Sequence, residues 1–222
     1  MKNYNWYNYN LKRNKEAIKI YNRIRRSKIN FLESGVYKNI RDIYALSILI
    51  CKTKNTRIKI LDYGGNLMSH VNLINKIDTK NIEISIFNPF IKKFINKTSI
   101  KIKFFKKMKG KILKKKFDLV YFGSVLQYIN SLKNLEGKKN ITNARVVLIT
   151  HTPISHRKKR FFLKQSNAKD LFQKIHTLSD INNDLLRKKF TILFKSINEN
   201  KYAGLKKKPE NVFSTNLIMK KK

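Results

Sequence analysis

The pattern of apolar and polar positions changes period several times along the chain. Apolar residues recur at helical spacing over 11–32 and again over 36–51, with a break at Ser34-Gly35 between them. From residue 57 onward, short apolar segments alternate with polar positions or run continuously, and they end at glycine, asparagine or proline. They predict strands over residues 57–62, 82–87, 99–105, 117–122, 144–150, 190–197 and 212–219.

Helical patterns fall between most of these strands. The sequence predicts helices over residues 66–77, 90–96, 131–136, 168–175 and 181–189, a basic connector over 106–116 and a polar, basic loop over 151–169. Strands that alternate with helices favour a parallel sheet covered on both faces. The run 117–122 is continuously apolar, as expected for a central strand. We therefore expect a Rossmann-like α/β domain with a mostly parallel seven-stranded sheet over 53–222, preceded by an arm and helices over 1–52.

Composition adds an extreme charge balance. The 222 residues are 41% hydrophobic, enough for one sizeable core, and 51 Lys+Arg face only 13 Asp+Glu, a formal charge of +38. Two interpretations stay open. AT-rich codons favour Lys, Asn, Ile, Phe and Tyr together, whereas a basic face for nucleic acid would also explain the shortage of acids. We expect at least weak, sequence-independent binding to RNA or DNA.

Other features exclude several classes of protein. Cys51 is the only cysteine, so no intrachain disulfide forms, which fits a cytoplasmic location. The first residues lack the apolar core of a signal peptide, and the longest apolar stretch, 43–51, is far shorter than the roughly 20 residues of a membrane span. The four histidines lack metal-ligand spacing, so no metal site is expected.

The segment Asp62-Tyr63-Gly64-Gly65-Asn66 is the strongest local signal. A strand ends there, the chain turns at two glycines, and a helix begins. Glycine lets the backbone approach a ligand closely, and the helix start adds free N–H donors, so these five residues are candidates for cofactor binding. The alternative is an ordinary strand-to-helix turn in which Asp62 holds the loop.

Two later positions are expected at the same edge of the sheet. Asn88 ends the second strand, where an acid that bonds ribose hydroxyls is usual in such folds, although Asn88-Pro89 is also compatible with a plain turn. Ser124, Gln127 and Tyr128 follow the fourth strand and supply polar groups at its carboxyl end. Their alternative role is helix capping by Ser124, with Tyr128 in the core.

Together, these motifs resemble a known family. The segments 61–67, 124–129 and 150–153, followed by Gln165-x-Asn167, are similar to a family of S-adenosylmethionine (SAM)-dependent methyltransferases whose members commonly sit among bacterial genes for surface polysaccharides. The resemblance covers roughly residues 57–195. It implies a class I methyltransferase fold, SAM as cofactor at the loop 62–66 and along 123–128, and a sugar or glycan-precursor acceptor. Met68 and Asn88 depart from the family's usual small residue and acid.

His151 is the candidate catalytic residue, because it follows the fifth strand, where a base can take a proton from an attacking hydroxyl. A loop histidine that caps backbone groups is the alternative. Two other functions stay open beside sugar O-methylation. One is an RNA-modifying methyltransferase with a Lys-rich binding surface, and the other is a non-catalytic Rossmann-like binding protein.

Overall fold

The structure is a computed structural model that describes residues 11–12, 15–16, 18–19, 35–52, 57–67, 70, 81–91, 101–156, 161–164, 172–198 and 211–222. Met68, Gln165 and Asn167 lie outside the described residues. So do most of the helices expected over 11–32, 66–77 and 90–96. Among the described residues, no helix is both long and apolar enough to cross a membrane.

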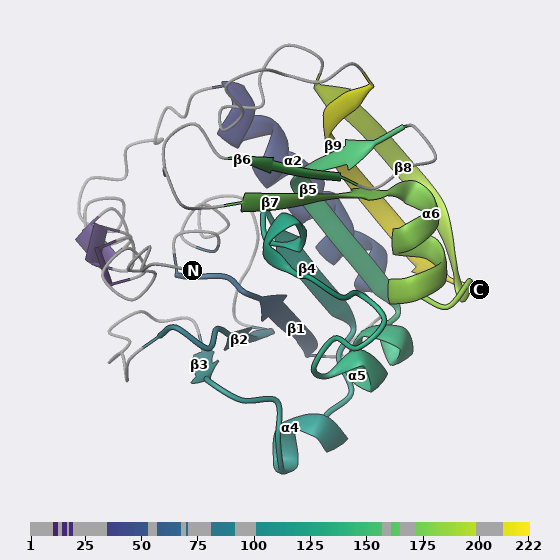
Figure 1. Cartoon of the computed structure of the whole chain (residues 1–222). Coiled ribbons are helices and arrows are strands. Elements are labelled where there is room, and N and C mark those ends of the chain that lie inside the picture. Colours follow the sequence, from purple (N-terminus) through teal and green to yellow (C-terminus); the bar gives the residue numbers. More distant parts are fainter. Residues whose placement is uncertain are drawn as a thin grey trace.

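A mixed sheet runs through the centre of the molecule (Figure 1). Neighbouring strands follow the order β3-β2-β1-β4-β5, all parallel; β9 then pairs with β5 in antiparallel fashion, and β8 pairs with β9. These seven strands are β1 Ile58–Tyr63, β2 Ile82–Phe87, β3 Lys101–Phe105, β4 Leu119–Gly123, β5 Val146–Ser155, β8 Phe190–Asn198 and β9 Val212–Lys221. Each starts within two residues of its predicted position, so the expected mostly parallel sheet is confirmed.

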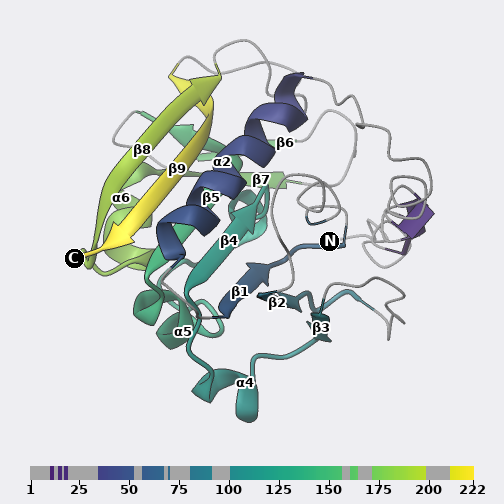
Figure 2. The same cartoon turned by 180° about the vertical axis from the view of Figure 1, so that it is seen from behind.

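Helices cover both faces of the sheet. Helix α2, Gly35–Cys51, crosses one face (Figure 2), and its Tyr44 and Ile48 pack with Ile60, Ile84 and other residues of the strands. The opposite face is covered by the short elements α4 Lys111–Lys114, η1 Leu126–Tyr128, α5 Lys138–Asn143, α6 Leu178–Asp180 and η2 Ile181–Leu185. Alternate residues of β1 therefore face different layers: Ile60 faces α2, and Leu61 faces the second core.

Two sequence-based expectations for residues 131–175 are wrong. The segment 131–136 forms turns, and the helix α5 begins only at Lys138. The expected loop over 151–169 and helix over 168–175 instead contain strands, because β5 continues to Ser155 and a hairpin of β6 Phe161–Lys164 and β7 Phe172–Thr177 follows.

The hairpin exists because β5 offers a free edge beyond the end of β4. Ile154 and Ser155 of β5 pair in parallel with His176 and Thr177 of β7, and β6 pairs antiparallel with β7. This pairing supplies partners for backbone groups of the strand extension, which would otherwise go unpaired. The hairpin therefore lies next to the carboxyl ends of the central strands (Figure 1).

Candidate functional site

The carboxyl ends of β1, β2 and β4 meet at one edge of the sheet. The Gly64 N–H donates to the carbonyl of Phe87 at 2.7 Å, which ties the β1 loop to the end of β2. Gly64 has φ +79°, and a Cβ added there would lie 2.3 Å from Cγ2 of Val125, just after β4. Only glycine fits this position, because both the backbone angle and the contact with Val125 exclude a side chain.

Gly65 is required for a different reason than the sequence analysis assumed. A Cβ built on Gly65 would lie 1.7 Å from Oδ2 of Asp62, inside its carboxylate. The absent side chain therefore makes room for Asp62 rather than directly for a ligand. The second glycine of the motif is a packing partner of the acid that precedes it.

The Asp62 carboxylate belongs to a buried polar chain that the sequence analysis missed. Asp62 Oδ2 lies 2.7 Å from Nε2 of His70, and Nδ1 of His70 lies 3.1 Å from the hydroxyl of Tyr44 on α2. Asp62 and His70 are fully buried, and Tyr44 nearly so. An ionised carboxylate only accepts hydrogen bonds, so Nε2 of His70 carries the proton and donates it to Asp62. This Tyr44–His70–Asp62 chain links α2 to the floor of the glycine loop.

Burial disfavours the ionised form of the Asp62 carboxyl group. Desolvation raises the pKa of Asp62, and the hydrogen bond from His70 offsets only part of that shift. The second oxygen, Oδ1, is buried without a hydrogen-bond partner among the described residues. In the part of the chain that the structure describes, His70 is the hydrogen-bond partner of the carboxylate beneath the loop.

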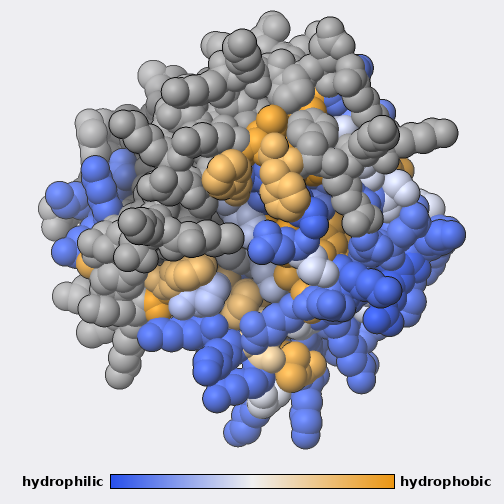
Figure 3. All heavy atoms as spheres, viewed as in Figure 1, coloured by the Kyte–Doolittle hydropathy of each residue, from blue (hydrophilic) through white to orange (hydrophobic). Residues whose placement is uncertain are grey.

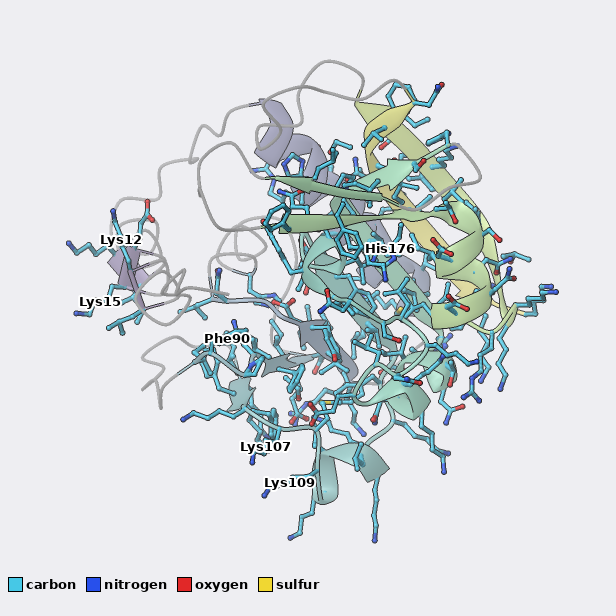
Figure 4. All side chains as sticks on the ribbon, viewed as in Figure 1. Lys12, Lys15, Phe90, Lys107, Lys109 and His176 are labelled. Carbon is cyan, nitrogen blue, oxygen red and sulfur yellow. The ribbon has the colours of Figure 1, made fainter. Side chains whose placement is uncertain are left out.

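Asn88 braces the same loop from the side of β2. Its side chain is 3% exposed, and Nδ2 donates to the carbonyl of Gly65 at 2.9 Å while Oδ1 accepts from the Phe90 N–H at 3.0 Å. The backbone N–H of Asn88 donates to Phe105 of β3. Asn88 thus fixes the loop and the end of β2, whereas the neighbouring ring of Phe90 is 54% exposed at the same edge (Figure 4).

The segment after β4 is held rigidly. Ser124 has φ +54°, and Nε2 of Gln127 donates to both the carbonyl and the hydroxyl of Ser124. Gln127 is buried and Tyr128 is partly exposed. His176 of β7 is labelled in Figure 4. Its Nε2 atom lies 3.1 Å from the carbonyl oxygen of Leu126 and 3.1 Å from that of Ile129. His176, a second residue that the sequence analysis missed, therefore fastens the β6–β7 hairpin to this segment.

Tyr63 and Asn66, the other two residues of the loop, differ in their exposure to solvent. The Tyr63 ring packs against Phe87 and Phe122 in the core and is 5% exposed, and burial raises the pKa of its hydroxyl. A ligand at this edge would meet the backbone of Tyr63 rather than its ring. Asn66 is partly exposed, just before the chain continues toward His70.

His151 lies within β5 and not after it, which corrects the expected position. The pairing of β5 with β9 shifts register between Ile149 and Thr152, and His151 on this bulge has φ +48°. Its backbone N–H donates to Oδ1 of Asn216, and its Nδ1 lies 3.0 Å from the Ser214 hydroxyl. A bulge re-aims a side chain locally, so β9 sets the direction of this histidine.

The register between β4 and β5 brings His151 to the same edge of the sheet as the loop residues. Gly123, the last residue of β4, pairs with Thr150, the residue before His151. Burial lowers the pKa of His151, which favours the neutral, proton-accepting ring at pH 7. Among the described residues, no three His, Cys, Asp or Glu side chains cluster to hold a metal ion.

Comparison with known proteins supports the fold. No protein-family model and no curated protein matches this sequence. Among solved structures, a candidate SAM-dependent methyltransferase from Listeria monocytogenes has a TM-score of 0.51 at 10% identity, covering 85% of this chain and 98% of that chain.

Two further solved structures are similar over most of the chain. A SAM-dependent methyltransferase from Methanosarcina mazei has a TM-score of 0.46 at 12% identity, covering 78% of this chain and 96% of its own. A didemethyltoxoflavin N1-methyltransferase from Burkholderia thailandensis has a TM-score of 0.48 at 9% identity, with 94% and 86% covered. The similarity to the Listeria structure shows that this chain has the Rossmann-like fold found in class I methyltransferases.

The buried chain yields a prediction about stability. His70→Ala removes the hydrogen-bond partner that Asp62 has among the described residues, and it should lower the free energy of unfolding at pH 7 by on the order of 3 kcal/mol. The exposed His156 provides the control, since His156→Ala should change it by less than about 0.5 kcal/mol. Urea unfolding measures both. A His70→Ala variant as stable as the wild type would show that Asp62 does not depend on this contact.

Proposed function

We propose that the protein is a class I SAM-dependent methyltransferase whose cofactor binds at the carboxyl ends of β1, β2 and β4. The observation that carries the proposal is the rigid glycine loop, fixed from below by Asp62 and His70 and from the side by Asn88. A loop held this firmly at the carboxyl edge of a parallel sheet is the usual ligand site of such folds.

The residues at this edge fit a nucleoside with an amino-acid tail. Backbone groups of residues 64–66 would hold the polar tail and ribose, with the partly exposed Ser124 and Tyr128 beside them, and the exposed Phe90 ring would offer a flat apolar surface to an adenine base. Asn88 acts through the loop that it braces. SAM supplies the electrophilic methyl group, and the protein's task is to bind, orient and exclude water.

His151 serves as the general base in this proposal. The acceptor is a hydroxyl of a sugar or glycan precursor, and His151 would accept the proton of that hydroxyl; the bound cofactor would supply the methyl group and leave as S-adenosylhomocysteine. Contacts from Ser214 and Asn216 support this role because they fix the ring and its backbone. The sugar class comes from the resemblance to methyltransferases among surface-polysaccharide genes. A cytoplasmic location, where SAM is made, belongs to the same proposal.

RNA is the second candidate acceptor, and one surface favours it. The segment 101–116 holds nine lysines and no Asp or Glu, and Lys107 and Lys109 extend outward beside α4 (Figure 4). Glu83 pairs with only two of these lysines, Lys115 at 3.1 Å and Lys103 at 3.6 Å. The other lysines of this segment are exposed, and they supply a basic surface suited to phosphates.

Cofactor binding is tested by calorimetric titration with S-adenosylhomocysteine. The wild type should bind it, and Gly65→Val should abolish binding because the new side chain displaces the Asp62 carboxylate. Asn88→Ala should weaken binding about fivefold, the equivalent of a lost hydrogen bond of about 1 kcal/mol.

The control is Gly110→Ala, whose added Cβ meets nothing within 4 Å. Because Gly110 has φ +63°, this change should lower the stability of the protein but leave the affinity of the folded protein unchanged. Absence of heat or thermal shift at millimolar ligand, from protein shown to be folded, would contradict the cofactor assignment. The non-catalytic binding protein would then be the leading interpretation.

The general-base role predicts a specific kinetic effect. His151→Ala should lower turnover by about 10²–10⁴-fold with unchanged affinity for S-adenosylhomocysteine. Because burial lowers the pKa of His151, the acid-side decline of wild-type activity should have its midpoint below pH 6.5, where the ring takes up a proton. A variant with wild-type turnover, or a midpoint of the decline above pH 6.5, would remove His151 from the reaction.

The basic surface predicts salt-sensitive binding to single-stranded RNA. The affinity should fall by several decades between low and physiological salt, because binding releases counterions. Replacing Lys106, Lys107 and Lys109 by Gln should flatten the salt slope more than the same change at Lys188, Lys189 and Lys221, which are also exposed. Fluorescence anisotropy measures both. Tight, structure-selective binding that persists at ~150 mM salt would instead make RNA the leading acceptor.

A further inference from the structure

Two exposed phenylalanines lie on the β6–β7 hairpin. Phe162 is 60% exposed and Phe172 is 58% exposed, the largest exposed fractions among the described large apolar side chains. Figure 3 shows orange surface in the region of this hairpin, above the middle of the view, with blue polar surface below it. Other large apolar side chains are also exposed, but Phe162 and Phe172 are two aromatic rings on adjacent strands, and a contiguous apolar patch of this kind marks a binding site more often than single exposed residues do.

The pairing of the hairpin puts both rings on one face. Phe162 lies opposite Lys174, and Phe172 lies opposite Lys164, so the two phenylalanines are diagonal neighbours, about 7–8 Å apart at the backbone. Lys174 Nζ lies 5.5 Å from the centre of the Phe162 ring, which confirms that these side chains share a face.

This face of the hairpin is turned toward the candidate site. Side chains alternate along β7, so Phe172, Lys174 and His176 lie on the same face, and Lys174 and His176 both contact the segment after β4. His176 reaches the carbonyls of Leu126 and Ile129, and Lys174 donates to the carbonyl of Asn130. The two rings therefore extend from an element fastened directly to the carboxyl edge of β4.

The exposed area of the two phenylalanine rings matches a ligand of the size of a single ring. A large aromatic side chain offers about 150–250 Å² in total, so two rings exposed to this degree present roughly 250 Å². A stable protein interface needs about 800 Å² per partner, several times more. A pyranose ring has one face of C–H groups that packs on an aromatic ring, while its hydroxyls stay in contact with water and polar neighbours.

We propose that Phe162 and Phe172 form an acceptor platform that holds a sugar ring at the carboxyl edge of the sheet. This inference rests on the proposed function, because the platform would present a sugar hydroxyl to the methyl group. Lys174, which contacts both Phe162 and Asn130, fixes the Phe162 ring relative to the segment that follows β4. The hairpin, absent from the sequence-based prediction, is then the element that selects the acceptor.

The test is saturation-transfer NMR on the full chain with S-adenosylhomocysteine added. The probes are a panel of methyl glycosides of hexoses and 6-deoxyhexoses, and a hexauridylate RNA. Wild-type protein should transfer saturation to the C–H face of at least one glycoside. The double variant that carries both Phe162→Ala and Phe172→Ala should reduce this transfer at least tenfold. Phe172→Trp, which keeps a ring, should retain it.

Leu193→Ala is the matched control, because Leu193 is 51% exposed on β8, and its transfer should equal that of the wild type. A separate titration with S-adenosylhomocysteine reports on the proposed cofactor site, and the platform variants should bind it as the wild type does. No transfer to any glycoside from protein that binds S-adenosylhomocysteine would overturn the platform. Transfer to the RNA alone, lost in the Phe162 and Phe172 variant, would replace the sugar with a nucleic-acid base.

Discussion

The candidate site depends on one buried carboxylate beneath a turn of the backbone. Asp62 occupies the space that a side chain at Gly65 would need, and it is held there by His70, which Tyr44 of α2 holds in turn. Burial raises the pKa of Asp62 and the hydrogen bond from His70 opposes that shift, so this contact favours the ionised carboxylate. The loop conformation is thus coupled to the packing of a helix on the far face of the sheet.

This coupling extends across the central strands. The Tyr44 ring stacks on Tyr121 of β4 at 4.6 Å, and the Tyr121 hydroxyl lies 3.0 Å from Oγ1 of Thr150, the residue before His151. Loop, helix and the strand that carries the candidate base therefore share one connected set of buried polar and aromatic contacts. A rigid edge of this kind suits methyl transfer, in which the protein mainly positions two reactants.

Sequence patterns predicted the sheet well, because alternation and glycine breaks are local signals. They identified the loop at Asp62 and the partners Asn88 and Ser124, which the structure brings to one edge. They missed what depends on tertiary pairing. His70 falls within a predicted helix and was considered only as a metal ligand, and the alternation of Phe172 to Thr177 became a strand only because the β5 extension pairs with it. The bulge at His151 likewise arises from the register with β9.

The central claim is that a cofactor binds where β1, β2 and β4 end. Hydrogen exchange followed by mass spectrometry, with and without S-adenosylhomocysteine, tests this location directly. The account predicts slower exchange in peptides that cover 62–67, 86–91 and 123–129, with no change in the β8–β9 pair. Protection confined to β8 and β9, or none at saturating ligand, would contradict it.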